Sequence, residues 1–362
     1  MKTKARQDYT QVSNFLEREH SDALQGIAVL LMVFHHLFDF PERISVPYSL
    51  VFVRFESVLA SFGRICIPML TFLSGYGFTR KFDLLVSSGE KVTIFNCYKS
   101  MVKSMLSFFY RYWIVFVVFV TYGLIVKIYP FDARVFFKSL FGLNDFYNRE
   151  WWYVTNYLIL LVSFPVLYSF LSVLRKKTSA AVNILVWVLI IAAGTVYLRV
   201  VSLASILMVL LAFLLGMVLE GYSLPDRLIA VFKDSDVLKT IIGITLFCLV
   251  FIIKVKFITY TAYNHFWGVL LVLSSALVIK TKWMTASLNH LLRFLGKYGI
   301  YIWLTHTFFA YYYFQKLTFL PYYSWLVYIW CILLSTATGV LLEFILGKLI
   351  LLLKKIIIRG YK

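Results

Sequence analysis

Two histidines, His36 and His306, lie deep inside hydrophobic stretches of the sequence. An ionisable side chain is costly to bury in a membrane, so such a residue is by default a candidate functional group. At a helical rise of about 1.5 Å per residue, each histidine lies about 18 Å from the start of its expected helix. Arg64 lies about 12 Å into the second hydrophobic stretch, which runs in the opposite direction. The three side chains are therefore expected at one level, slightly outside the middle of a bilayer core about 30 Å thick.

These residue types suit acid–base chemistry on a polar substrate. A neutral imidazole is a good general base near pH 7, and a surrounding of low dielectric constant disfavours its charged form. Arg64 stays charged and needs a water-filled cavity, a carboxylate or an anionic ligand. Asp39 follows His36 by three residues, so it can hold the imidazole as the acid of a catalytic triad does. His35 points about 100° away from His36 and is expected to be a supporting residue.

A structural alternative stays open for these groups, because buried polar side chains also pair with one another between helices. For His36 and Arg64 the functional interpretation is favoured. For His306 the two interpretations weigh equally, since its ring can hydrogen-bond to the backbone or to a tyrosine.

Membrane-spanning helices must position these residues. The chain has 362 residues and is 61% hydrophobic, whereas soluble domains are about 45–50% apolar. Its apolar stretches predict an all-α, polytopic membrane protein that forms one domain over residues 1–362, with short tails at about 1–22 and 353–362. About ten transmembrane helices are expected, at residues 24–40, 56–78, 104–127, 151–174, 181–199, 202–220, 238–254, 264–279, 294–314 and 323–352.

The net charge of +19 is better explained by membrane topology than by nucleic-acid binding. If the N-terminus is cytoplasmic, most of the 36 Lys and Arg residues fall in the tails and loops on the cytoplasmic side. Cytoplasmic loops of membrane proteins carry such an excess, so both termini are predicted inside and no nucleic-acid partner is expected.

Metal and soluble-enzyme motifs are missing from the sequence. There is no HxxxH or CxxC pair, so no metal site is predicted, and the four cysteines are expected to be packing residues (Cys66, Cys97, Cys248 and Cys331). Ser74 and Gly75 lie in an apolar helix, where small residues more often allow close packing than act as nucleophiles. His265 lies near the end of a span, where a histidine needs no special role.

Four segments of the sequence resemble the integral-membrane acyltransferase-3 family. Asp22-Ala-Leu-Gln25-Gly26-Ile27-Ala28 leads to His36, eleven residues after Gln25, as in the family pattern D-x-L-R-G-I-A followed by histidine. Three further segments resemble other family patterns. Arg64 to Tyr76 is similar to R-x-x-V-P-x-F-F-x-x-S-G-Y, and Trp152 to Pro165 is similar to W-F-L…P. Phe294 to His306 is similar to F-L-G-K-x-S-x-x-I-Y-L-x-H. Their order is that of the family and they cover most of the chain.

The resemblance implies an enzyme that takes an acyl group, usually acetyl, from cytoplasmic acetyl-CoA. The acceptor is a hydroxyl of a cell-envelope or capsular polysaccharide, or of its lipid-linked precursor, at the outer face. The implied partners are membrane lipid, acyl-CoA as a donor substrate, and the glycan; no permanently bound cofactor is implied. The implied location is the bacterial cytoplasmic membrane.

Residue roles follow from the same resemblance and from the chemistry above. His36 takes the proton of the acceptor hydroxyl or carries the acyl group, and Asp39 holds the His36 ring. Arg64 stabilises the oxyanion, and loss of such a stabilising group typically lowers rates about 10²–10³-fold. Residues expected on the acceptor side are His306, His35, Ser74, Trp152 and Tyr153. Residues expected to contact the coenzyme A phosphates are Gln25, Lys99, Lys103 and Arg80.

Two departures from the family pattern keep an alternative open. Gln25 stands where the family has arginine, and the basic R-x-x-R cluster before the third span is altered, with Lys99 and Lys103 its nearest equivalents. A polysaccharide export or assembly protein without acyl transfer is therefore the second hypothesis, and an inactive scaffold is the third.

The aromatic residues near the outer ends of the spans, Tyr311–Tyr313 among them, are expected mainly to form an interfacial belt.

Overall fold

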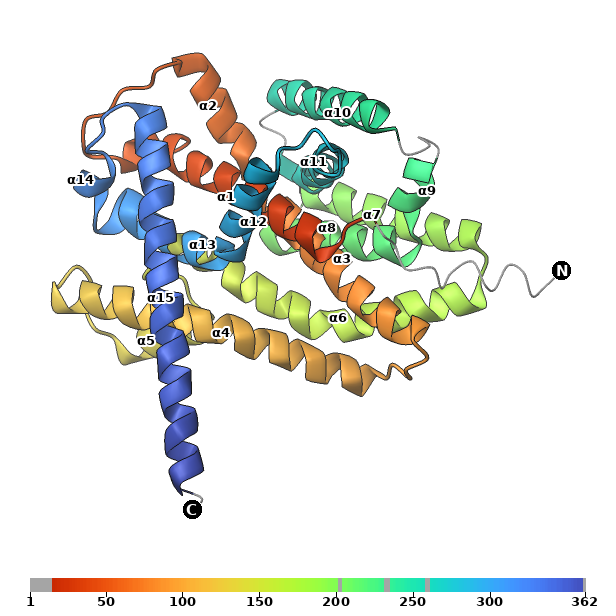
Figure 1. Cartoon of the computed structure of the whole chain (residues 1–362), viewed down its shortest axis with the longest axis horizontal. Helices are drawn as coiled ribbons and strands as arrows, with labels where there is room; N and C mark the ends of the chain where they lie inside the picture. Colours follow the sequence, from red (N-terminus) through yellow and green to blue (C-terminus); the bar gives the residue numbers. More distant parts are fainter. Residues whose placement is uncertain (1–14, 201–203, 231–234, 258–260, 361–362) are drawn as a thin grey trace. The chain divides into compact units, whose positions relative to one another are not determined.

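The computed structural model describes residues 15–200, 204–230, 235–257 and 261–360 (Figure 1). Its regular elements are all helices in this part of the chain, where Ser49 and Tyr323 form an isolated β-bridge. The α-helices are α1 (Arg18–Phe38), α2 (Val53–Phe62), α3 (Cys66–Ser87), α4 (Ile94–Ile125), α5 (Ala133–Leu140), α6 (Trp152–Lys177), α7 (Ala180–Val200), α8 (Ala204–Gly221), α9 (Leu224–Ala230), α10 (Asp236–Lys256), α11 (Asn264–Ile279), α12 (Ala286–Lys297), α13 (Gly299–Thr307), α14 (Gln315–Thr318) and α15 (Ser324–Gly360). Short 3₁₀ turns are η1 (Pro41–Arg43), η2 (Gly63–Ile65), η3 (Arg149–Trp151) and η4 (Thr261–Tyr263), and η5 (Phe308–Tyr312) is a π-helix.

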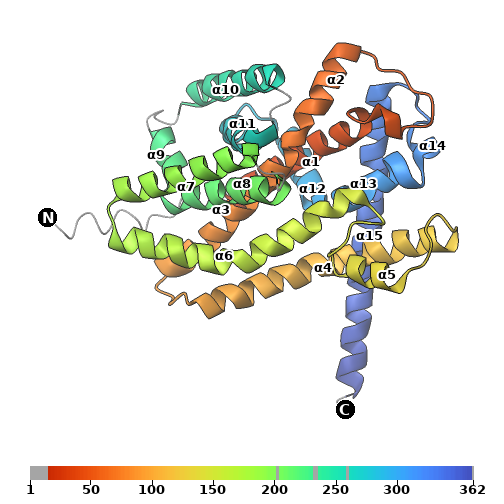
Figure 2. The ribbon, with the colours of Figure 1, turned by 180° about the vertical axis from the view of Figure 1, so that it is seen from behind.

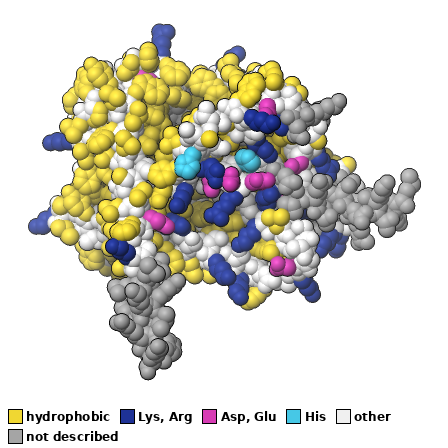
Figure 3. All heavy atoms as spheres, in the orientation of Figure 1, with side chains coloured by type: hydrophobic (Ala, Val, Ile, Leu, Met, Phe, Trp, Pro, Cys, Tyr) yellow, Lys and Arg dark blue, Asp and Glu magenta, His cyan; other side chains and the backbone are white. Residues whose placement is uncertain are grey.

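Eight helical segments of the described chain are long and apolar enough to cross a membrane. They are Arg18–Phe38, Val53–Ser87, Ile94–Ile125, Arg149–Lys177, Ala181–Arg199, Asp236–Lys256, Thr261–Ile279 and Ser324–Leu349. Many of their apolar side chains are exposed, such as Val117, Leu185 and Leu341, and hydrophobic side chains cover much of the face shown in Figure 3. Apolar side chains on the outside suit contact with lipid, so the prediction of an all-α multi-pass membrane protein is confirmed.

Two of the ten expected spans, at 202–220 and 294–314, have no counterpart among these eight long helices. The stretch predicted at 202–220 corresponds to α8, in which 205–221 form a shorter apolar helix; residues 202 and 203 lie outside the described residues. The expectation of one continuous helix over 294–314 is wrong, because α12 ends at Lys297, α13 starts at Gly299, and η5 follows it. Tyr298 between them has φ −93° and ψ 6°, which interrupts the α-helical geometry. Of the predicted tails, residues 1–14 and 361–362 also lie outside the described residues.

The chain forms two compact units that interleave along the sequence. Unit 1 contains the described residues of Met1–Met32, Ser61–Lys103 and Leu158–Gly296. Unit 2 contains those of Val33–Ala60, Ser104–Tyr157 and Lys297–Lys362. Helices α1, α4 and α6 each contribute residues to both units.

Close packing of α3 against α8 dominates unit 1, and the two helices lie side by side in Figures 1 and 2. A Cβ atom placed on Gly75 would lie 2.2 Å from the carbonyl oxygen of Phe213, and one placed on Gly216 would lie 2.2 Å from that of Phe72. Neither position has room for a side chain, so the two backbones touch directly. Small residues at helix contacts allow this approach in membranes, as expected for Gly75.

Replacing Gly75 by alanine should therefore destabilise unit 1 by about 1–3 kcal/mol, since the added methyl group forces α3 and α8 apart. Gly77 on the same helix is the matched control, because a Cβ atom there meets nothing within 4 Å. Gly77→Ala should leave stability unchanged or raise it by up to about 1 kcal/mol, the helix propensity of alanine. Thermal unfolding in detergent measures both, and equal midpoints for the two variants would contradict the packing argument.

An aromatic core in unit 2 holds α13 in place. Trp151 is 2% exposed, and its ring lies 5.0 Å from that of Tyr112 on α4 and 5.6 Å from that of Phe308. The Trp151 indole Nε1–H also donates to the carbonyl oxygen of Leu304 on α13 at 3.2 Å. The short helix that carries His306 is thus anchored by both packing and a hydrogen bond.

Candidate active site

His36 and His306 lie next to each other in unit 2. His36 occupies the last turn of α1, His306 lies on α13, and their ring centroids are 5.1 Å apart. His36 Nδ1 and His306 Nε2 are both buried and have no hydrogen-bond partner in the described structure. Two imidazoles with unpaired nitrogens in one place can form hydrogen bonds with a polar ligand.

The backbone of α13 orients His306. Its Nδ1 lies 2.9 Å from the carbonyl oxygens of both Ile302 and Trp303. The end of α13 is also tied to the residue that precedes η3, since Asn148 Nδ2 donates to Thr307 Oγ1 at 2.7 Å. His306 is 0% exposed, so these contacts hold a fully buried ring.

Asp39 contacts His35, whereas the sequence suggested that it holds His36. His35 Nδ1 lies 2.8 Å from the carbonyl oxygen of Ala60 and 3.4 Å from Asp39 Oδ2. Helix α1 ends at Phe38, so Asp39 follows the last helical turn and is four residues from His35. The His35 ring in turn lies 4.9 Å from that of His36, which places His35 beside the pair as the expected supporting residue.

A charged network that the sequence did not reveal lies beside the histidine pair. Arg43 in η1 donates to Glu150 Oε1 at 2.6 Å and to the hydroxyl of Tyr312 at 3.2 Å. Its guanidinium carbon lies 3.7 Å from the ring centre of Tyr311, and the Tyr311 ring lies 6.5 Å from that of His36. Burial is the largest single influence on the pKa of Arg43 and lowers it, but the hydrogen bond to Glu150, the charge of Glu150 and the two tyrosines together raise the pKa. The charged Arg43 thereby fixes Tyr311 against His36.

No local pattern in the sequence marks this network. Arg43 and Glu150 are 107 residues apart and follow different spans. Tyr311 and Tyr312 occur in an aromatic run that is equally typical of an interfacial belt.

Of the other residues expected near the acceptor, two lie in unit 2. Trp152 and Tyr153 begin α6, and the Tyr153 ring lies 5.5 Å from that of Trp303 on α13. Arg64 and Ser74 belong to unit 1. Arg64 lies in η2 and interacts electrostatically with Lys254 on α10, while Ser74 Oγ donates to the carbonyl oxygen of Leu70 at 2.9 Å.

The four residues expected to bind the donor all belong to unit 1. Gln25 lies on α1 and Arg80 on α3, where the Arg80 Nη1 atom is buried without a hydrogen-bond partner among the described residues. Lys99 and Lys103 are exposed and lie one turn apart on α4. They were expected just before this helix, but α4 begins at Ile94 and includes them.

A second buried histidine site lies in unit 1, although the sequence suggested no special role for His265. This residue is 0% exposed, and its Nε2 lies 3.1 Å from Thr195 Oγ1. Thr195 donates its own proton to the carbonyl oxygen of Ile191 at 2.7 Å, so its oxygen accepts from His265. This hydrogen bond joins helices α7 and α11, whereas His265 Nδ1 is buried without a hydrogen-bond partner among the described residues.

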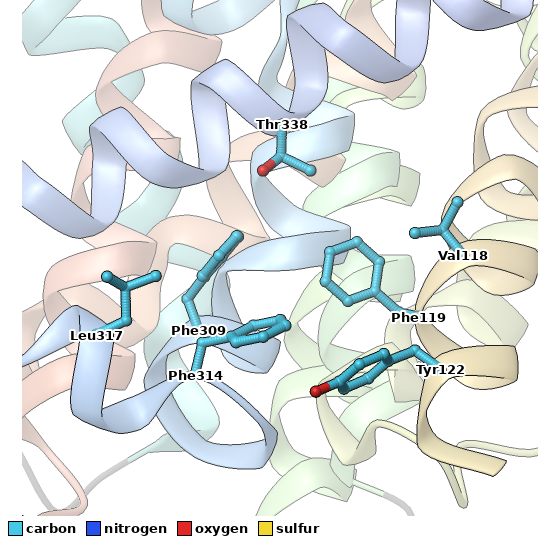
Figure 4. A pocket seen from close by; sticks show the side chains of 7 residues that line it. All are labelled: Val118, Phe119, Tyr122, Phe309, Phe314, Leu317 and Thr338. Carbon is cyan, nitrogen blue, oxygen red and sulfur yellow. The ribbon is translucent and has the colours of Figure 1, made fainter. Parts of the chain in front are cut away.

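An apolar cavity of about 370 Å³ also lies in unit 2. Figure 4 shows its lining side chains, which come from α4, η5, α14, α15 and the turn before α14. They are mostly apolar: Val118, Phe119, Tyr122, Phe309, Phe314, Leu317 and Thr338. Such a lining suits a hydrocarbon chain better than a sugar.

The protein is a multi-pass helical protein, and one of its sites contains two imidazole nitrogens without hydrogen-bond partners among the described residues. Such nitrogens can take part in proton transfer inside the membrane. Residues 19–344 match the family model described as an acyltransferase domain. This match covers nearly the whole chain, and the protein belongs to the acyltransferase-3 family of membrane acyltransferases. No curated protein and no solved structure gives a significant match.

Proposed function

We propose that this acyltransferase moves an acetyl group from cytoplasmic acetyl-CoA to a hydroxyl of a cell-envelope or capsular polysaccharide, or of its lipid-linked precursor, in the bacterial cytoplasmic membrane. The observation that carries the proposal is the histidine pair. His36 Nδ1 and His306 Nε2 are buried in one site without hydrogen-bond partners among the described residues. Transfer of an acyl group to an alcohol requires removal of the hydroxyl proton, and imidazole is the side chain best suited to this at neutral pH.

The donor contacts are assigned to basic residues of unit 1. Coenzyme A is polyanionic and cannot enter hydrocarbon, so its phosphates need cations at the membrane surface. Lys99 and Lys103 present two ammonium groups on one face of α4, and Arg80 has a guanidinium nitrogen without a hydrogen-bond partner in the described chain. Gln25, which stands at the position of the family arginine, can contact the donor only as a neutral hydrogen-bonding group.

Reversing both lysine charges in Lys99→Glu/Lys103→Glu should raise the KM for acetyl-CoA at least about tenfold, because two attractive charges become repulsive. The kcat should change little, since these residues do not belong to the unit that holds the histidine pair. Initial rates over a range of acetyl-CoA concentrations in membranes measure both constants. Lys316→Glu is the control, an exposed lysine of unit 2, and an equal rise of KM in that variant would contradict the assignment.

The apolar cavity favours a lipid-linked acceptor over a free polysaccharide. It belongs to the same unit as the histidine pair, and Phe309 in its wall follows His306 by three residues. Among its lining residues, Val118 and Tyr122 lie on the transmembrane helix α4 and Thr338 on α15, so hydrocarbon chains of the membrane are its natural occupants. A carrier lipid in this cavity holds its attached glycan in the unit that contains the two imidazoles.

Labelled acetyl-CoA added to membranes tests the proposal directly. Label should appear in the glycan fraction as an ester that mild alkali removes. A deletion strain separates the proposal from polysaccharide export: polymer that reaches the surface without acetyl esters supports the acyltransferase. Polymer that stays inside the cell, together with unlabelled glycan in the membrane assay, would overturn it.

A further inference from the structure

The hydrogen bonds of His306 determine which of its two ring nitrogens carries the proton. Nδ1 lies 2.9 Å from two backbone carbonyl oxygens, those of Ile302 and Trp303. A carbonyl oxygen can only accept a hydrogen bond, so Nδ1 must be the donor and must carry the hydrogen. In the neutral ring the other nitrogen, Nε2, then holds a lone pair.

This lone pair has no partner within the described structure. His306 Nε2 is buried without a hydrogen bond, and the ring is 0% exposed. The neighbouring ring is that of His36, whose Nδ1 is likewise buried and unpaired. A buried acceptor that meets no donor is rare in a folded protein, and it is explained if a substrate supplies the donor.

We infer that His306 is the general base of the reaction: its Nε2 accepts the proton of the acceptor hydroxyl. The inference rests on the proposed acyl transfer and assigns to His306 the proton transfer that the sequence assigned to His36. The carbonyl oxygens of Ile302 and Trp303 hold the ring in the required tautomer, as the carboxylate does in a catalytic triad. His36 then faces the same substrate from α1 and contacts the acyl donor.

The step balances without a further reactant. The acceptor oxygen forms a bond to the carbonyl carbon of the thioester while its proton moves to His306 Nε2. When the tetrahedral intermediate collapses, the carbon–sulfur bond breaks and the proton on Nε2 passes to the leaving thiolate. The products are the ester and free coenzyme A, and His306 returns to its starting tautomer.

Two amide variants separate this role from a structural one. Asparagine in His306→Asn places its amide near the position of Nδ1 and can keep the hydrogen bonds to the two carbonyl oxygens, but it has no equivalent of Nε2. If His306 is the base, His306→Asn should lower kcat about 10³-fold, and His306→Gln should lower it similarly. Thr305→Ser is the control on the same turn, because serine retains the hydroxyl that donates to Tyr301.

Nitrogen NMR of the wild-type protein, labelled at its histidine rings and placed in lipid, gives an independent result. The His306 signals, assigned from their loss in either variant, should show a protonated Nδ1 and an unprotonated Nε2. A protonated Nε2 would overturn the inference, and so would a His306→Asn variant that retains wild-type kcat. Both results are distinct from failure of the proposed function, in which the wild-type protein itself transfers no label to glycan.

Discussion

His36→Ala should lower the transfer of labelled acetyl groups to glycan about 10²–10³-fold, the typical loss when a group that stabilises the transition state is removed. The His36 ring lies 5.1 Å from that of His306, and its Nδ1 is buried without a partner in the described chain. Replacing His36 therefore removes one of the two imidazoles, and no neighbouring group loses a hydrogen bond to the His36 Nδ1 atom. The fold should remain intact, because no hydrogen bond to that Nδ1 is lost.

His290→Ala is the matched control for this prediction, since it removes an exposed histidine of α12 in unit 1. Both variants should show the same thermal unfolding midpoint as the wild type in detergent. Full labelling of the glycan by a correctly folded His36→Ala protein would show that the histidine pair is not the reaction centre. The proposed function would then have to be carried by residues elsewhere in the chain.

Arg43→Leu should destabilise unit 2 by about 3 kcal/mol, the usual consequence of leaving a buried charge without its partner. Glu150 is 7% exposed, and its Oε1 atom accepts from Arg43 at 2.6 Å. The same substitution removes the cation that lies 3.7 Å from the ring centre of Tyr311. Tyr311 is then no longer held against His36, so the acyl-transfer rate should fall together with the stability.

A double replacement, Arg43→Leu/Glu150→Leu, should recover much of the lost stability, because it removes the second charge as well. Arg54→Leu is the control, an exposed arginine on α2 in the same unit. Unfolding midpoints in detergent measure all three variants. An Arg43→Leu midpoint no lower than that of Arg54→Leu would show that the ion pair contributes nothing to the stability of unit 2.

Much of the fold was predictable from the sequence because membrane crossing has a local signature. An apolar stretch long enough to span the bilayer must form a helix that satisfies its own backbone hydrogen bonds. The eight long apolar helices follow from this rule, as does the membrane environment. Span limits were less predictable: α4 begins ten residues before the predicted start at 104, because apolar pattern alone does not mark where a helix leaves the bilayer.

The two histidines were also visible in the sequence, because burying an ionisable group in a membrane is costly and therefore marks function. Only the tertiary structure decided which groups they contact. It places His306 Nδ1 against the carbonyl oxygens of Ile302 and Trp303, and it pairs Asp39 with His35. It also joins Arg43 to Glu150 and seats Tyr311 beside His36. Those contacts depend on where α13 starts and on residues more than a hundred positions apart, which no local spacing specifies. The sequence therefore determined the residue types, and the fold determined their hydrogen-bond partners.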